Sequence, residues 1–184
     1  VRRATRGAAG GARRRAAATT QVNGGPAFPA RVVLATGNAG KLREMREILA
    51  PLRVEVLPQS DFTRGSAEET GLSFVENAIL KARYAAEAAG LPAIADDSGL
   101  EVDALHGAAG ILSARYAGPG ADDEANNARL LRELSAVPDD ERGARYRCAM
   151  VCLRWPLDPA PLVCQASWEG RIGRVARGNG GFAY

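Results

Sequence analysis

The segment Thr36–Lys41, with the sequence TGNAGK, has the residue types needed to hold a phosphate. Its glycines allow the backbone to approach an anion closely, and a following helix would offer unpaired N–H groups with positive potential. Lys41 adds a positive charge, and the side chains of Thr36 and Asn38 can donate hydrogen bonds. Phosphate binding is therefore one function that this segment could perform.

TGNAGK is not a Walker A loop. That motif has a glycine five residues before its Gly-Lys pair and Ser or Thr after it, whereas Ala35 and Leu42 stand at those positions here. An ordinary tight turn between a strand and a helix would also use these glycines. The sequence alone leaves both interpretations open.

A second candidate is Asp96-Asp97-Ser98-Gly99, which follows the apolar run Ala93–Ala95. Two adjacent carboxylates are costly to bury together, because their charges repel and both lose hydration. A divalent cation relieves that repulsion, and Mg²⁺ binds to one or two carboxylates together with substrate phosphates and waters. The alternative is a turn in which Asp and Ser cap the backbone. The pattern favours the metal site.

A third candidate lies in the segment 66–71, SAEETG, and in the helix predicted to follow it. Glu68 or Glu69 could supply another metal ligand. Asn77 and Lys81 are four residues apart and therefore share one face of that helix, which we expect to point away from its alanine stripe. Taken alone, these acids and this lysine are more typical of a solvated surface.

Two charged or titratable residues of the loop 106–120 also need an interpretation. Arg115 could bind a phosphate with two hydrogen bonds, although an exposed loop arginine is equally compatible with the pattern. The single histidine, His106, neighbours no candidate nucleophile in the sequence. We interpret it as a non-catalytic loop residue.

The charge of the chain is concentrated at its N-terminus. Residues 1–30 contain six arginines and no acid, whereas the remainder has 18 basic and 21 acidic side chains. The net charge of +3 therefore gives no reason to expect nucleic-acid binding by residues 31–184. Residues 1–30 lack apolar periodicity, so we predict a disordered tail there, with an organelle transit peptide as the less favoured alternative.

Composition also bears on compartment and on the cysteines. No stretch approaches the roughly 20 apolar residues of a membrane-spanning helix, so we expect a cytoplasmic protein without membrane contact. Three cysteines, Cys148, Cys152 and Cys164, fit neither a disulfide framework nor a zinc site. We expect buried, reduced thiols.

The elements that must position the candidate residues follow from apolar periodicity. Strands are predicted at Arg31–Thr36, Leu52–Leu57, Ala93–Ala95, Leu100–Leu105, Ala144–Arg154 and Leu162–Gly170. Helices are predicted at 40–50, along the alanine-rich stretch from Val75 to Ala89, and at Asp122–Val137. Helices alternate with strands early and an antiparallel pair comes late, which predicts an α/β fold with a mixed sheet.

Five sequence blocks together resemble the inosine triphosphate pyrophosphatase family, in particular its dITP/XTP pyrophosphatase branch. The blocks are TGNAGK at 36–41, SAEETGLSFVENAILKA at 66–82, LPAIADDSGLEVDAL at 91–105, GILSARYAG at 110–118 and GNGGFAY at 178–184. The resemblance implies an elongated mixed β-sheet flanked by helices, with two lobes and a central cleft in residues 31–184. It also implies a homodimer that uses Mg²⁺ to hydrolyse dITP, ITP and XTP to the monophosphate and pyrophosphate.

The resemblance further implies roles for individual residues, all in substrate, metal or proton handling. Asp97 would be the general base and, with Glu68, a metal ligand, and a nearby metal would keep the pKa of Asp97 low. The residues implied to bind the substrate are Thr36, Gly37, Asn38, Ala39, Gly40, Lys41, Lys81, Ser98, Arg115, Phe182, Ala183 and Tyr184.

This sequence departs from the family pattern at its C-terminus. It stops at Tyr184 within the family's G-F-G-Y-D segment, and Ala183 stands where glycine is usual. The family's later base-contacting residues, a lysine and a His-Arg pair, are not in the sequence. On that basis we expect the chain as given to be weakly active, unselective or unstable by itself.

Three other functions remain as alternatives. A related pyrophosphatase could act on modified pyrimidine triphosphates, and a catalytically inactive domain could only bind nucleotides. A nucleic-acid-binding function would rest on the arginine-rich tail alone.

Overall fold

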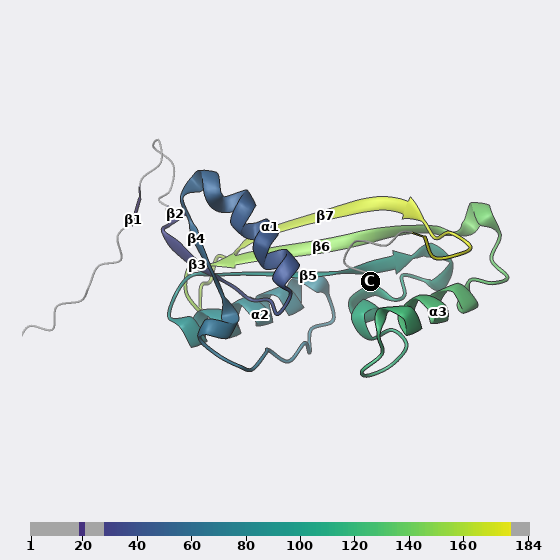
Figure 1. Cartoon of the computed structure of the whole chain (residues 1–184), viewed down its shortest axis with the longest axis horizontal. Helices are drawn as coiled ribbons and strands as arrows, with labels where there is room; N and C mark the ends of the chain where they lie inside the picture. The colour runs from purple at the N-terminus through teal and green to yellow at the C-terminus, as the bar shows by residue number, and fades with distance from the viewer. Residues whose placement is uncertain (1–18, 21–27, 178–184) are drawn as a thin grey trace, which may run out of the picture.

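The computed structural model describes residues 19–20 and 28–177, and within them the chain forms an elongated mixed sheet flanked by helices (Figure 1). The sheet has the strand order β4-β3-β5-β6-β7. Its strands are β3 (Arg31–Leu34), β4 (Glu55–Pro58), β5 (Ala93–Val102), β6 (Gly143–Leu153) and β7 (Leu162–Arg171). The helices are α1 (Ala39–Leu49), α2 (Phe74–Ala89) and α3 (Asp123–Glu133). The predicted α/β class is confirmed.

Short 3₁₀ helices connect these elements. They are η1 (Ala50–Leu52), η2 (Gln59–Asp61), η3 (Asp103–Leu105), η4 (Gly110–Arg115) and η5 (Asp139–Glu141). None of the helices in the described parts of the chain is long and apolar enough to cross a membrane.

The order of the parallel strands creates a switch point in the sheet. β3 lies between β4 and β5 and runs parallel to both, so the chain leaves β3 in one direction through α1 and returns to its other side through α2. β3 pairs with only the first two residues of β5, and β5 then continues antiparallel to β6 alone. In open α/β sheets, ligands bind beyond the carboxyl ends of the strands at such a point.

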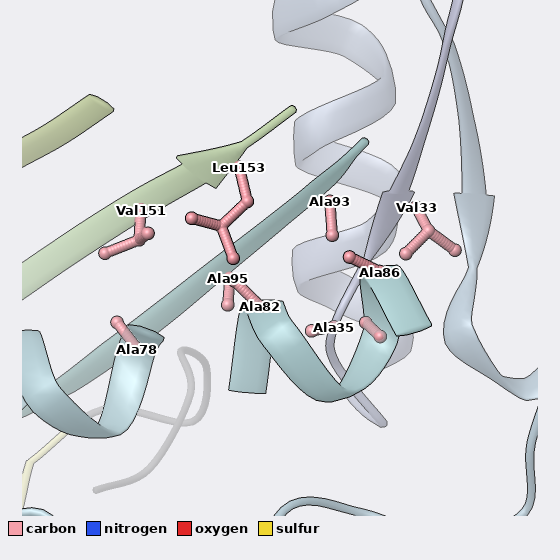
Figure 2. Close-up of a cluster of buried hydrophobic side chains, with 10 residues drawn as sticks. Val33, Ala35, Ala78, Ala82, Ala86, Ala93, Ala95, Val151 and Leu153 are labelled. Carbon is pink, nitrogen blue, oxygen red and sulfur yellow. The ribbon is translucent and has the colours of Figure 1, made fainter. Parts of the chain in front are cut away.

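Helices α1 and α2 cover opposite faces of the sheet because successive strand residues alternate in direction. The alanines of α2 pack on Val33, Ala93 and Val151, and most of this cluster is shown in Figure 2. Their small side chains let the helix approach the sheet closely. α1 instead packs on the alternate residues Val32 and Ile94. α1 begins shortly after the carboxyl end of β3, near the switch point.

Helix boundaries follow ordinary capping chemistry. Ser73 caps α2 by accepting from the N–H of Glu76 at 3.2 Å, and Gly90 ends the helix with φ +62°. Asp122 caps α3 in the same way. α3 ends at Glu133, so its predicted extension to Val137 is wrong.

The prediction of two separate strands, Ala93–Ala95 and Leu100–Leu105, is wrong, and so is the alternative of a turn at residues 96–99. β5 is continuous from Ala93 to Val102 and pairs with β6 at every position, from Ala93↔Leu153 to Val102↔Ala144. The hydrogen bonds of this uninterrupted ladder pair the backbone groups of residues 96–99, which the turn interpretation expected side chains to cap. The continuity of β5 depends on its pairing with β6, which is about 50 residues away in the sequence, so the local sequence could not predict it.

The predicted tail is described only in part. Thr19–Thr20 (β1) pairs antiparallel with Phe28–Pro29 (β2), and residues 1–18 and 21–27 lie outside the described residues. The implied substrate-binding residues Phe182, Ala183 and Tyr184 also lie outside them.

Candidate functional site

A cavity of about 350 Å³ lies at the switch point of the sheet. It is bounded by the end of β3, the start of α1, the segment before α2, the middle of β5 and the end of η4. Six charged side chains line it: Lys41, Glu69, Lys81, Asp96, Asp97 and Arg115. Three are cations and three are carboxylates, so the cavity can bind both a polyanion and a cation.

The TGNAGK segment forms one wall of this cavity, with Asn38 as the N-cap of α1. Its Oδ1 accepts from the N–H groups of Gly40 at 2.8 Å and Lys41 at 3.1 Å. The prediction that the helix offers unpaired N–H groups is therefore wrong for these two, because the Asn38 side chain already satisfies them. An anion at this wall would depend on the Lys41 ammonium and on close approach to the backbone.

Gly37 leaves open space at this wall, where a ligand could approach the backbone closely. A Cβ at Gly37 would meet no other atom within 4 Å, and the residue does not have the left-handed conformation that requires glycine. The packing of the protein therefore gives no reason for a glycine here. A ligand that approaches the backbone would supply that reason, which favours the phosphate-binding interpretation over the ordinary turn.

Asp96 and Asp97 lie on opposite faces of β5, because they are neighbours in a strand. Asp96 Oδ2 lies 2.7 Å from Lys41 Nζ, on the α1 side. Asp97 Oδ1 lies 2.7 Å from Lys81 Nζ, on the α2 side. The expectation that the two carboxylates crowd each other and share one cation is wrong, because each carboxylate has a lysine of its own.

Lys41 and Lys81 are the only lysines in a chain with 22 arginines. Both lie in the cavity, on opposite sides of one strand. An ammonium is a compact charge on a flexible stem with three donors, whereas a guanidinium is a planar fork. The two cations paired with the β5 carboxylates are therefore both ammonium groups.

Lys81 also connects Asp97 to the segment before α2. Its Nζ lies 3.3 Å from Glu69 Oε1, and Glu69 Oε2 lies 3.0 Å from Arg115 NH1. The expectation of solvated surface charges is wrong for Lys81 and Glu69, whose side chains are only 19% and 29% exposed. Glu69 is half-buried and lines the cavity, whereas Glu68 is exposed and does not line it.

The protein environment shifts the two carboxylates that share Lys81 in opposite directions. Burial raises the pKa of Asp97 above its ordinary value, and the ion pair with Lys81 reverses this only in part. Burial also acts to raise the pKa of Glu69, but its hydrogen bond to Arg115 and its contacts with Lys81 lower it overall. The low pKa expected for Asp97 from a nearby metal is thus not what the protein's own groups produce.

Arg115 reaches the cavity from η4, which is held at both ends. Ser113 Oγ accepts from the N–H of Leu100 at 2.8 Å and donates to the carbonyl of Gly110 at 2.7 Å. The buried side chain of Asn126, on α3, accepts from the N–H of Ala117 at 2.7 Å and donates to the carbonyl of Ala114. Arg115 therefore projects from a positioned backbone rather than from a free loop.

Among the remaining predicted residues, Ala39 is the first residue of α1 and does not line the cavity, whereas Ser98 and Thr36 do. Ser98 Oγ lies 3.4 Å from both Lys41 Nζ and Asp96 Oδ2, so it belongs to the α1 side of the site. Thr36 also lines the cavity, and its Oγ1 accepts from the N–H of Asn38. Phe182–Tyr184 are not placed.

The sequence pattern did not distinguish Glu69 from Glu68 and predicted no contact for Asn77 in the site. Asn77 is fully buried, and its Nδ2 lies 3.4 Å from Asp97 Oδ2. The capping sequence Ser73-x-x-Glu76 indicates that Asn77 lies in the first turn of the helix. This sequence does not indicate which face of that turn packs against β5, so the contact with Asp97 could not be predicted from it.

Comparison with known proteins gives a consistent answer. A profile described as the Ham1 family matches residues 32–184. The chain is 63% identical over 154 residues to a dITP/XTP pyrophosphatase from Thioalkalivibrio sulfidiphilus, covering 84% of this chain and 79% of that protein. It is 56% identical to a dITP/XTP pyrophosphatase from Escherichia coli K12, with coverage of 84% and 78%.

Solved structures agree with these sequence matches. The structure of a HAM1 protein from Coxiella burnetii superposes with a TM-score of 0.79 at 47% identity, covering 84% of this chain and 78% of that one. The Staphylococcus aureus Ham1 protein superposes with a TM-score of 0.74 at 39% identity and the same coverage. The profile, the sequence relatives and the shared fold together show that this chain belongs to the Ham1 family.

Proposed function

We propose that this chain hydrolyses the non-standard purine triphosphates dITP, ITP and XTP to the monophosphate and pyrophosphate. Such hydrolysis removes these nucleotides from the pool before they enter DNA or RNA. The observation that carries this proposal is the cavity at the switch point, where three cations and three carboxylates converge. The curated relatives named dITP/XTP pyrophosphatase support the choice of substrate.

The cations would bind the triphosphate by exchanging partners. In the structure, Lys41 is paired with Asp96, and Lys81 and Arg115 are paired with Asp97 and Glu69. A triphosphate would replace these carboxylates as the acceptor for three positive groups. Charge neutralisation on the leaving pyrophosphate is the main electrostatic requirement of attack at the α-phosphorus.

Asp97 would accept the proton of the attacking water. It lines the cavity, and its two oxygens face Lys81 and Asn77. A carboxylate whose pKa is raised by burial is a stronger base than an ordinary one once it is ionised. Both of its oxygens face a donor on α2, and Asn77 would keep its contact when Lys81 turns to the triphosphate.

The donor set also fits Mg²⁺, although its presence is a proposal. The cavity offers carboxylate and hydroxyl oxygens, with no His or Cys among the residues that line it. Among the described residues no cluster of three His, Cys, Asp or Glu could hold a metal by itself. Mg²⁺ typically combines one or two carboxylates with substrate phosphates and waters, so Asp97 with Glu68 or Glu69 would be sufficient. When bound, Mg²⁺ would polarise the phosphate and lower the pKa of the attacking water.

Two further expectations remain proposals. One is the homodimer that the resemblance implies, and the other is the cytoplasmic location expected from the lack of a membrane-spanning stretch in the sequence. Sedimentation velocity of the purified protein at concentrations from about 1 to about 50 µM, a range in which many dimers form, would test the homodimer.

The reaction can be tested by following the products of a substrate panel. The protein is incubated in H₂¹⁸O with ITP, dITP, XTP, GTP, ATP and a modified pyrimidine triphosphate, with and without Mg²⁺. Attack at the α-phosphorus places ¹⁸O in the monophosphate and leaves the pyrophosphate unlabelled. Faster turnover of GTP or of the pyrimidine would refute the purine assignment, and binding without turnover would show a catalytically inactive binding domain.

Binding can be tested independently of turnover, because the chain has only two lysines. Pyridoxal phosphate followed by borohydride labels Lys41, Lys81 and the N-terminal amine, and mass spectrometry quantifies each site. A triphosphate should protect both lysines and leave the N-terminal amine unprotected. Gly37→Ala should retain its melting temperature and lose this protection, because its Cβ has space in the protein but would occupy the phosphate wall.

A further inference from the structure

Asn77 is a buried, uncharged side chain that donates a hydrogen bond to Asp97. It lies in the first turn of α2 and is 0% exposed. Its Oδ1 accepts from the N–H of Gly71 at 2.8 Å, and its Nδ2 lies 3.4 Å from Asp97 Oδ2. One amide therefore connects the segment that carries Glu69 to the strand that carries Asp97.

Both neighbours require the same orientation of this amide. The N–H of Gly71 can only donate, so it must meet the oxygen of Asn77. An ionised Asp97 can only accept, so it must meet the NH₂ group. The donor and acceptor pattern of the site thus admits a single arrangement of the side chain.

Gly71 makes the first of these contacts possible by its close approach to α2. A Cβ at Gly71 would lie 2.6 Å from Glu76 Cβ and 2.7 Å from Asn77 Oδ1. The neighbouring N–H of Leu72 is also held, by Glu76 Oε2 at 2.8 Å. The backbone two residues after Glu69 is therefore attached to the first turn of α2.

We propose that Asn77 is a positioning residue that orients the Asp97 carboxylate relative to Glu69. Lys81 holds Asp97 Oδ1 at 2.7 Å, and Asn77 holds Oδ2, so both oxygens have a donor from the same helix. The contact at 3.4 Å is long, as catalytic hydrogen bonds often are without substrate. This inference rests on the proposed function, because it assigns Asn77 to the carboxylate that would activate water.

Replacing Asn77 by Asp separates the two contacts. In Asn77→Asp one oxygen still accepts from the N–H of Gly71, whereas the group facing Asp97 changes from a donor to a carboxylate oxygen. A residue that only anchors the segment before α2 would be replaced without loss. A residue that orients Asp97 would not, because Asp97 loses its second donor and gains a like-charged neighbour.

The experiment measures kcat and KM for ITP, the Kd of a non-hydrolysable α,β-methylene analogue, and the melting temperature. We expect kcat of Asn77→Asp to fall by about tenfold or more, about 1.4 kcal/mol of transition-state free energy, because the base is misoriented. KM and Kd should stay within about threefold, since Asn77 touches none of the phosphate-binding cations directly. Asn77→Ala, which loses both contacts, should show the same loss of kcat and a raised KM.

Val151→Ala is the matched control, because Val151 is fully buried against the same helix and takes no part in the site. It should lower the melting temperature and leave kcat within about twofold, since it removes only apolar packing. The positioning role is overturned if Asn77→Asp retains kcat within twofold of the natural protein. It is also overturned if the kcat loss is no larger than that of Val151→Ala at an equal fall in melting temperature. If the natural protein itself releases no pyrophosphate from any triphosphate, the proposed function fails and the positioning role fails with it.

Discussion

Gly99 is the position at which one added methyl group should damage the site most measurably. It lies on β5, two residues after Asp97, and η4 packs directly over it. A Cβ at Gly99 would lie 2.3 Å from the carbonyl oxygen of Gly110, 2.7 Å from Ser113 Oγ and 3.0 Å from a ring carbon of Phe74. Contacts below 3.0 Å are essentially never tolerated, so the Gly110 backbone must retreat by at least 0.7 Å in Gly99→Ala.

The retreat should weaken both stability and activity. Overpacking of this kind costs about 1–3 kcal/mol, and in a chain of this size it should lower the melting temperature by roughly 2–12 °C. The displaced helix carries Arg115, and a misplacement of about 1 Å near a reacting group can reduce the rate by about 100-fold. We therefore expect kcat/KM for ITP to fall by between about 10- and 100-fold, because Arg115 no longer meets the phosphates in register.

The assay is a thermal unfolding scan paired with steady-state hydrolysis of ITP, and Gly170→Ala is the control. Gly170 is also a strand glycine, on β7, and a Cβ there would meet nothing within 4 Å. It should be neutral or stabilise the protein by about 0.4–1 kcal/mol, because alanine restricts the unfolded chain. If Gly99→Ala matched Gly170→Ala in melting temperature and kcat/KM, the role assigned to this close contact would be refuted.

Three further predictions concern the charged groups and the thiols. Lys41→Met should raise KM for ITP by at least about tenfold with a smaller change in kcat, because it removes a phosphate-binding cation, and a retained KM would contradict the exchange of ion partners. Asp97→Asn should abolish turnover and yet be at least as stable as the natural protein at pH 7 in thermal unfolding. Burial raises the pKa of Asp97 in the folded state above its ordinary value of 3.8. The folded protein therefore becomes less stable as pH rises from 3.8 through the folded-state pKa, because Asp97 must then ionise where it is buried. The stability advantage should disappear below pH 3.8, and a large loss of stability at pH 7 would show the assigned direction to be wrong. Iodoacetamide should label the exposed Cys164 before Cys148 and Cys152, whose pKa values are raised by burial, and peptide mass spectrometry after timed quenching would show the order.

The elements of this fold could be predicted because their signals are local. The alanine stripe of α2, the β-branched run of β3 and the alternating pattern of β6 each lie within one short window of sequence. The predicted starts of α2 and α3, Val75 and Asp122, each lie one residue from the observed starts, Phe74 and Asp123. The thiols were predicted less well, because Cys164 lies on the edge strand β7 and is exposed, contrary to the expectation of burial.

The sequence by itself determined which residue types are available for chemistry and that they cluster in three short blocks. Only the tertiary structure decided how they pair: Asp96 with Lys41, Asp97 with Lys81, and Glu69, rather than Glu68, with Arg115. The physical reason is the sequence separation of the partners, which is 55 residues for the first pair and 46 for the last. Pairs so far apart depend on strand order and on the alternation of β5, which directs two neighbouring carboxylates to opposite faces of the sheet. Neither composition nor spacing contains that information, because it arises only when β3, β5 and the two helices pack together.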